Sequence, residues 1–180
     1  GRSTEEIEHL EAHGVAVRIC PGVTAASAAA ASGLASLTLR GLARRLAFVT
    51  AHARAGEALD LDWTGLAASD ATLAVYMGRA AAGEISTRLM AAGRAADTPV
   101  MVAVNVSLPN ERLIRGRLDA LAFLVRTVSD DDPTLLLIGG KGPPAPGANR
   151  APPQVASTLG DYAVLGRLAA ETIADATLVE

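Results

Sequence analysis

The sequence predicts an α/β protein with a mixed β-sheet flanked by helices, and three observations support this fold class. Half of the 180 residues are hydrophobic but only 3% are aromatic, so the core has to be built from Ala, Val, Leu and Ile, which suits helices packed on a buried sheet. Short runs of branched apolar residues alternate with segments of helical periodicity. Two of these runs are joined by a short segment, which favours an antiparallel hairpin within the sheet.

The first expected element is a helix that begins at Ser3. Ser3 and Glu6 have the spacing of a capping box, and Gly14 is a typical helix terminator. An extended strand is expected next, over residues 15–20, because this run is apolar and stops at Pro21-Gly22.

A second helix is expected to begin after Thr24, which can cap it, and to end near Ser32, before Gly33. Further along the chain, branched apolar runs predict strands and 3.6-residue periodicity predicts helices. The expected strands are 46–50, 72–76, 100–104, 112–117 and 134–138, and the expected helices are 80–92 and 118–128. The hairpin joins the strands at 100–104 and 112–117 through residues 105–111.

The carboxyl-terminal part of the chain has a different composition. Five of the nine prolines lie in residues 143–153, so residues 141–153 are expected to form an extended linker. Apolar residues then recur at helical spacing, and residues 154–180 are expected to form one amphipathic helix. The sequence leaves open whether this helix docks on the domain, pairs with a partner or frays. The α/β domain itself is expected over residues 23–140.

Composition also excludes several classes of protein. A net charge of −3 and few aromatic residues argue against nucleic-acid binding. No uninterrupted apolar run is long enough to span a membrane. Cys20 is the only cysteine, so there is no internal disulfide, and a reducing cytoplasm is the expected location. No catalytic residue or metal ligand is assigned, because His52 has no partner in sequence and the run Asp130–Asp132 reads as a solvated turn.

Residues 21–27 are the most informative candidate for a ligand site. Pro21-Gly22 ends the expected strand, and Thr24 and Ala25 begin a helix with small side chains. Backbone N–H groups at such a helix start are open to a ligand. A tight strand-to-helix packing joint needs the same small residues, and the two interpretations are equally supported.

Two further segments follow apolar strands directly. Tyr76-Met77-Gly78 leaves one expected strand, and Asn105-Val106-Ser107 leaves another. Ligands of open α/β sheets usually bind beyond the carboxyl ends of the strands. Met77 offers a soft apolar wall, and Gly78 allows close backbone approach. We expect both segments to line the same edge of the sheet.

Together these segments are similar in order and spacing to motifs of the tetrapyrrole methylases, and most of all to the uroporphyrinogen-III C-methyltransferases. The resemblance covers residues 1 to about 139. The segments that carry it are Gly-Arg-Ser-Thr-Glu-Glu at 1–6, Pro-Gly-Val-Thr-Ala-Ala-Ser at 21–27, Asp62-Trp63, Tyr76-Met77-Gly78, Asp97-Thr98-Pro99 and Arg-Leu-Ile-Arg-Gly-Arg-Leu at 112–118.

The resemblance implies the carboxyl-terminal domain of the tetrapyrrole methylase fold and a methyltransferase that uses S-adenosyl-L-methionine. The implied reaction converts uroporphyrinogen III to precorrin-2, in siroheme or cobalamin biosynthesis, and family members are commonly homodimers. In such enzymes backbone groups hold the cofactor, and the matching positions are Thr24, Ala25 and Met77. Val106 stands at a cofactor position where the family commonly has Gly.

Substrate residues are less well matched. The family's His-Arg-Asp reads here as Leu39-Arg40-Gly41, so Arg40 is one candidate partner for substrate carboxylates, and Arg79 is another. These departures fit equally a methylase of another tetrapyrrole (precorrin) intermediate. A non-catalytic dimerisation module is the alternative from a different class.

The resemblance also sets an expectation for the activity of the chain alone. The family's Gly-Pro-Gly-Asp and Gly-Gly-Asp-Pro motifs and its acid/base residues precede Gly1 in the matching order. Residues 1–22 are therefore expected to be a remnant of the amino-terminal domain. Because positioning dominates the rate of methyl transfer, the chain by itself is expected to be inactive.

Overall fold

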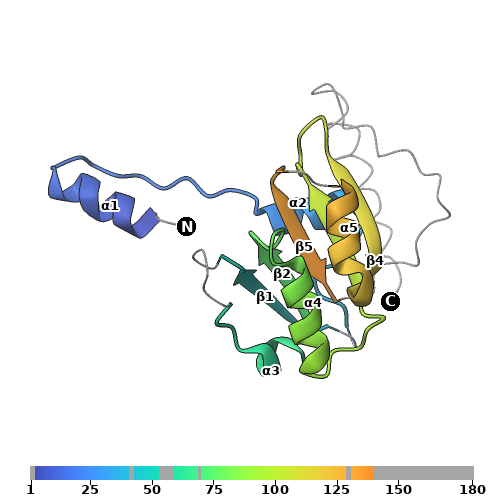
Figure 1. The fold of residues 1–180 in the computed structure, drawn as a ribbon. Coiled ribbons are helices and arrows are strands. Elements are labelled where there is room, and N and C mark those ends of the chain that lie inside the picture. The colour runs from blue at the N-terminus through green and yellow to red at the C-terminus, as the bar shows by residue number, and fades with distance from the viewer. Residues whose placement is uncertain (1–2, 41–42, 53–58, 69, 129–130, 140–180) are drawn as a thin grey trace, which may run out of the picture.

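A computed structural model of the chain describes residues 3–40, 43–52, 59–68, 70–128 and 131–139. Its centre is a five-stranded sheet with the order β1-β2-β5-β3-β4, shown in Figure 1. The pair β1·β2 is parallel, whereas β2·β5, β3·β5 and β3·β4 are antiparallel. The mixed sheet and the hairpin between its third and fourth strands are thus confirmed. The strands are β1 (Arg45–Thr50), β2 (Ala71–Tyr76), β3 (Pro99–Val104), β4 (Arg112–Arg117) and β5 (Thr134–Ile138).

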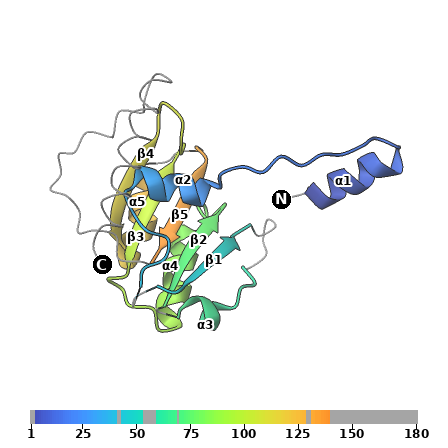
Figure 2. The same cartoon turned by 180° about the vertical axis from the view of Figure 1, so that it is seen from behind.

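Helices cover the two faces of the sheet unequally. One face carries α3 (Trp63–Leu66), α4 (Ala82–Ala91), the short 3₁₀ turn η1 (Leu118–Ala120) and α5 (Leu121–Val128). The opposite face carries α2 (Ala25–Ser32), as the reversed view in Figure 2 shows. The predicted helices at 25–32, 80–92 and 118–128 are therefore present, and the last of them begins with a 3₁₀ turn.

Successive side chains of each strand point to opposite faces of the sheet, and this alternation produces one hydrophobic core on each face. On β2, Leu73 and Val75 face the core beneath α4 and α5, whereas Ala74 faces α2. On the α2 side, Ala26 and Ala29 pack against this small side chain with no exposed surface. Because both the helix and the strand present alanine at this contact, α2 can pack close to the sheet. This packing positions the start of α2 beside the ends of the strands.

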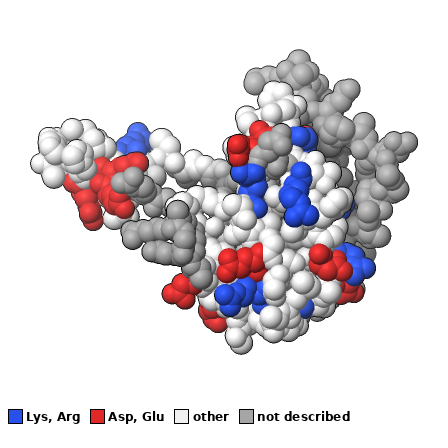
Figure 3. Space-filling model, in the orientation of Figure 1, with Lys and Arg blue, Asp and Glu red and all other residues white. Residues whose placement is uncertain are grey.

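The structure corrects one predicted strand. Residues 15–20 are extended but form no strand, because no described strand lies alongside them to accept backbone hydrogen bonds. The helix α1 (Ser3–Ala12) precedes them and has no buried residue. It stands apart from the sheet in Figures 1 and 2, and Figure 3 shows acidic side chains gathered on it. Gly14, with φ 71°, ends it as predicted.

Other predicted segments are not tested in this way. The linker at 141–153 and the amphipathic helix at 154–180 lie outside the described residues. The domain division at residues 22, 140 and 153 stays a prediction. No described helix is long and apolar enough to cross a lipid bilayer.

Candidate functional site

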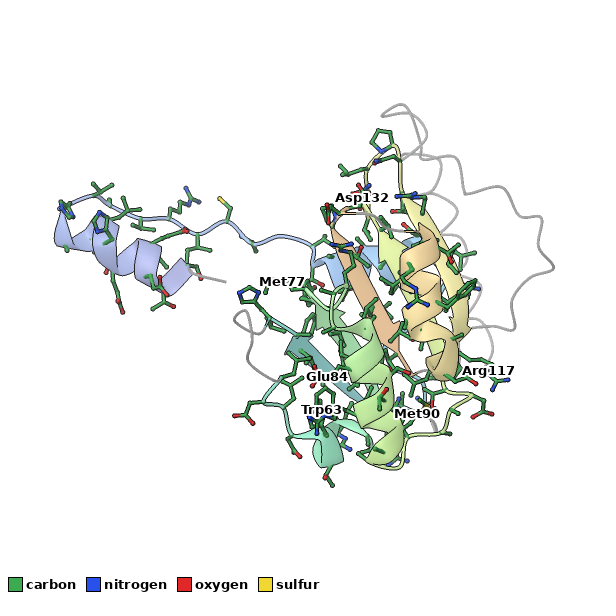
Figure 4. The ribbon with its side chains drawn as sticks, in the orientation of Figure 1. Trp63, Met77, Glu84, Met90, Arg117 and Asp132 are labelled. Carbon is green, nitrogen blue, oxygen red and sulfur yellow. The ribbon has the colours of Figure 1, made fainter. Side chains whose placement is uncertain are left out.

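A pocket of about 450 Å³ opens at one edge of the sheet. Because β2 and β3 both run antiparallel to β5, their carboxyl ends meet at the edge where β5 begins. The start of α2 closes this edge on one face of the sheet. In Figure 4, Met77 and Asp132 lie toward this edge, whereas Met90 and Arg117 lie toward the opposite one.

The floor of the pocket is a row of side chains that crosses three strands. Tyr76 on β2 is in register with Leu135 on β5, and Leu135 is in register with Ala103 on β3. All three line the pocket, as does Ala25 at the start of α2. An apolar floor of this kind suits a ring system better than a hydrated ion.

Side-chain hydroxyls organise the first turn of α2. Thr24 is the N-cap, and its Oγ1 accepts a hydrogen bond from the backbone N–H of Ser27 at 3.1 Å. The N–H of Ala26 donates to the Tyr76 hydroxyl at 3.2 Å. Among the described residues the N–H of Ala25 has no acceptor, and Ala25 lies at the pocket wall. One backbone donor is therefore available to a ligand.

Two loops complete the wall with unusual backbone geometry. Met77 follows β2 with φ 54°, and Asn105 follows β3 with φ 52°, both in the left-handed region. Behind Met77, a Cβ on Gly78 would lie 2.9 Å from side-chain atoms of Leu136 and Val75. The absent side chain at Gly78 thus lets the loop pack down on the sheet, which directs Met77 outward, where it is 56% exposed.

Asn105 is the one buried polar side chain of the pocket among the described residues, at 4% exposed. Its backbone N–H donates to the carbonyl oxygen of Pro133 at 3.0 Å, which ties the end of β3 to the start of β5. Its side-chain Nδ2 is buried and has no hydrogen-bond partner there. Such an orphaned amide is costly in an empty protein interior and is a common feature of ligand sites.

Two arginine–aspartate pairs stand at the mouth of the pocket. Arg79 lies 2.5 Å from Asp131, and Arg112 lies 2.5 Å from Asp132. The Asp131 side chain is 97% exposed, so its attraction for Arg79 is weakened by water. Arg79 lines the pocket and can therefore exchange this partner for another carboxylate at little cost.

The structure brings together most of the residues singled out in the sequence. Ala25, Met77, Val106 and Arg79 all line the pocket, and Thr24 caps the helix beside it. The expectation that the segments after the second and third strands share one edge of the sheet is met.

Arg40 lies elsewhere. It is exposed and precedes β1, and β1 is parallel to β2, so the chain enters the sheet here at the edge opposite Met77. His52 is also exposed. Among the described residues no group of acidic, histidine or cysteine side chains could hold a metal ion.

Sequence reasoning did not assign two contributors to the pocket. The role of the Tyr76 hydroxyl was missed, although an aromatic side chain with a polar tip at the end of an apolar strand was visible. The wall formed by Pro133, Thr134 and Leu135 was also missed. It depends on β5 lying between β2 and β3, and no local pattern encodes that strand order.

Comparisons with known proteins agree with this geometry. Residues 1–122 match the model of the Tetrapyrrole (Corrin/Porphyrin) Methylases. The siroheme synthase of Zymomonas mobilis subsp. mobilis is 39% identical over 142 residues, which are 79% of this chain and 30% of that protein. The uroporphyrinogen-III C-methyltransferase of Paracoccus denitrificans is 40% identical over 139 residues, which are 77% of this chain and 48% of that protein.

Solved structures give the same result. The uroporphyrin-III C-methyl transferase of Thermus thermophilus, complexed with S-adenosylhomocysteine, superposes with a TM-score of 0.62 and 34% identity over 77% of this chain and 59% of that one. A cobalt precorrin-4 methyltransferase superposes with a TM-score of 0.68 and 28% identity over 76% and 57% of the two chains. The chain thus spans about half of the methyltransferases it resembles and under a third of the siroheme synthase. It belongs to the tetrapyrrole (corrin/porphyrin) methylase family.

Proposed function

We propose that the protein is an S-adenosyl-L-methionine-dependent C-methyltransferase that converts uroporphyrinogen III to precorrin-2, in siroheme or cobalamin biosynthesis. The observation that carries the proposal is the pocket that unites Ala25, Met77 and Val106 at one edge of the sheet. These are the positions at which the chain resembles the cofactor-binding segments of its family. A 34% identical relative has been solved with S-adenosylhomocysteine.

The pocket has the chemistry that the methyl donor requires. Its walls include the apolar side chains of Met77 and Leu108, and the N–H of Ala25 supplies a backbone donor beside the Thr24 cap. Asn105 adds a buried amide. Thr24, Ala25, Met77 and Val106 are the proposed cofactor-binding residues.

For the tetrapyrrole, Arg79 is the better-placed of the two candidate residues. Uroporphyrinogen III carries eight carboxylates, and a guanidinium binds a carboxylate in bidentate geometry. Arg79 lines the pocket mouth, where the substrate would meet the cofactor. Arg40 could contact only a part of the substrate that extends beyond this pocket.

The test of the proposed function is a methyl-transfer assay on the full-length protein that carries this sequence. The protein is incubated with S-adenosyl-L-methionine and with uroporphyrinogen III that has been prepared under reducing conditions. The expected product is the dimethylated precorrin-2, which mass spectrometry detects. A folded protein that binds S-adenosylhomocysteine but methylates no tetrapyrrole would contradict the reaction while leaving the cofactor site intact.

The 180-residue chain by itself calls for a separate experiment. It spans 48% of the Paracoccus relative and 59% of the Thermus one, and small-ligand sites typically bury about 70–90% of the ligand surface. We propose that these residues alone do not complete the cofactor site. Calorimetric titration with S-adenosylhomocysteine should then give no micromolar binding, and micromolar affinity would show that they suffice.

A second candidate is methylation of a later, precorrin-type intermediate. The superposition on the cobalt precorrin-4 methyltransferase, with a TM-score of 0.68, favours it, and so does the replacement of the family's His-Arg-Asp around Arg40. An assay that contains both uroporphyrinogen III and a precorrin-4-type substrate distinguishes the two candidate functions, because only the true substrate should receive the methyl group.

We also propose that the protein is a homodimer in the cytoplasm. Family resemblance supports the dimer, and the exposed free thiol of Cys20 suits a reducing compartment. The molar mass in solution, measured by light scattering with and without residues 141–180, tests the dimer and shows whether those residues form its interface. A monomer in both cases would contradict it.

A further inference from the structure

The first turn of α2 presents its backbone donors in an unusual way. A helix start normally leaves several N–H groups unpaired, and these together attract anions. In this helix the N–H of Ser27 is bonded to Thr24 Oγ1 at 3.1 Å, and that of Ala28 to the Thr24 carbonyl oxygen at 3.0 Å. The N–H of Ala26 is taken by the Tyr76 hydroxyl at 3.2 Å. Among the described residues, the N–H of Ala25 has no acceptor, and Ala25 lines the pocket.

We propose that Tyr76 is a positioning residue of the cofactor site, which occupies the Ala26 donor and locks the start of α2 onto the edge of the sheet. This inference rests on the proposed function. The hydroxyl bridges two elements that are 50 residues apart in sequence. Its bond fixes the direction in which the neighbouring Ala25 N–H points, without Tyr76 itself taking part in methyl transfer.

The tyrosine ring is itself held in place. Its backbone is in register with Leu135 across the sheet, and its ring stacks against Phe48 with centroids 6.1 Å apart. The hydroxyl therefore has little freedom to swing away from α2. A positioned acceptor loses less conformational entropy when it forms its bond than a mobile one would.

A second observation points to a ligand in the same pocket. Asn105 lines the pocket, is 4% exposed, and has a side-chain amide without a partner among the described residues. Among the described residues, the inner wall thus offers a backbone donor at Ala25 and an amide donor at Asn105, apart from the Arg79 guanidinium at the mouth. Ala25 and Asn105 each suit an isolated acceptor atom, and the helix start lacks the several converging N–H groups with which a helix terminus binds phosphate.

The test compares Tyr76→Phe with the wild type in the full-length protein. The Phe variant keeps the ring and its stacking but leaves the buried Ala26 N–H without an acceptor. Affinity for S-adenosylhomocysteine, measured by calorimetry, is expected to fall on the order of tenfold. The KM for S-adenosyl-L-methionine should rise in parallel, while kcat at saturating cofactor and the KM for the tetrapyrrole stay within about twofold.

Phe48→Leu is the matched control, since it removes the stacked ring but keeps the hydroxyl that accepts the Ala26 N–H, and it should lower cofactor affinity by less than Tyr76→Phe does. A purely structural role for Tyr76 would lower the melting temperature and alter kcat and both KM values together. Unchanged cofactor affinity in a folded Tyr76→Phe variant would overturn the inference.

One measurement needs no variant. In the wild type, hydrogen exchange should show the Ala26 amide already protected without ligand, and S-adenosylhomocysteine should add protection at Ala25. Fast exchange at Ala26 in the free protein would overturn the role of Tyr76. A wild type that does not bind S-adenosylhomocysteine at all would instead overturn the proposed function together with this inference, so the two failures are distinguishable.

Discussion

Met77 and Asn105 adopt the same left-handed backbone conformation, with φ 54° and 52°, at the ends of two strands that flank β5. Both residues line the pocket. Non-glycine residues rarely adopt this conformation, because Cβ crowds the backbone. Asn tolerates it comparatively well, whereas Met gains nothing from it. We therefore expect backbone strain at Met77 to lower the stability of the fold in order to form the pocket.

Replacing Met77 with Gly should separate stability from binding. Glycine removes the left-handed strain, worth about 1–2 kcal/mol, but its unfolded chain is more flexible by about 0.5–1 kcal/mol. The free energy of unfolding, from urea titration, should therefore stay the same or rise by about 1 kcal/mol. Affinity for S-adenosylhomocysteine should fall, because the apolar wall is lost. Met77→Ala is the control: it should lose the same affinity and be no more stable than Met77→Gly. A Met77→Ala variant that is more stable by about 0.5–1 kcal/mol, the cost of glycine flexibility alone, would show that position 77 is unstrained.

Val106 supplies a side chain where related enzymes commonly have none. It is half-buried and lines the pocket, so shortening it should widen the proposed cofactor site. Val106→Ala is expected to raise affinity for S-adenosylhomocysteine severalfold while lowering the free energy of unfolding by about 1 kcal/mol or less. Leu108→Ala, at a 53% exposed position of the same wall, should give no gain. Weaker binding by Val106→Ala would mean that the valine contacts the ligand favourably.

Arg94 lies at the opposite edge of the sheet and is only 5% exposed. Its guanidinium donates to the carbonyl oxygens of Leu66, Ala68 and Ala71. Burial lowers the pKa of Arg94, and the charge of Asp70 opposes this, yet arginine remains protonated in proteins. The side chain therefore joins α3 to the start of β2 through backbone groups rather than through an ion pair.

Arg94→Met should consequently be destabilising. It leaves three carbonyl oxygens without their donor, and each buried unsatisfied group costs about 1–3 kcal/mol. Partial access of water to these carbonyls reduces the sum, so we expect a loss of about 2–4 kcal/mol in urea unfolding. Arg88→Met is the control, because Arg88 is 52% exposed and its contact with Glu84 is 3.6 Å long; its effect should be below about 0.5 kcal/mol. Comparable losses in the two variants would contradict a specific role for Arg94.

Local patterns were sufficient for most of the fold. Runs such as 100–104, apolar on both faces, are buried by helices on each side, so strand position followed from composition alone. Residues 15–20 are also mostly apolar, apart from Arg18, but no described strand lies beside them, and a strand needs a hydrogen-bonding partner that sequence does not reveal. α3 was missed because four residues are too short to show periodicity, although the cap bond from the Gly65 N–H to Asp62 Oδ1 at 3.0 Å follows a recognisable pattern.

The site was predictable only in part, for a related reason. Small residues at Ala25 and a glycine after Met77 are local signals, and both were recognised. The Tyr76–Ala26 hydrogen bond and the wall at Pro133 depend instead on the order of strands, which is set by tertiary packing. Arg40 was chosen from its position in a motif, and the direction of β1 places it at the other edge of the sheet.

The ion pair between Asp70 and Arg45 should make a small part of the stability depend on pH. The hydrogen bond from Arg45 lowers the pKa of Asp70 below its usual value, and the two side chains are 2.5 Å apart. A carboxylate whose pKa is lower in the folded state stabilises the fold above the unfolded pKa, about 4. That contribution disappears as the pH falls through the folded value.

Asp70→Asn removes this titration while keeping the Asp70 backbone oxygen, which accepts hydrogen bonds from the Arg44 and Arg45 amides. The variant should be slightly less stable than the wild type at pH 7, and the difference should shrink below about pH 4 and vanish once Asp70 is protonated in the folded state. Because both side chains are about half exposed, high salt should shrink it too. Urea titrations from pH 7 to 3 measure it. Asp97→Asn, at an exposed residue without an ion pair to any described residue, should show no such convergence, and a gap that stays constant for Asp70→Asn would contradict the role of the ion pair.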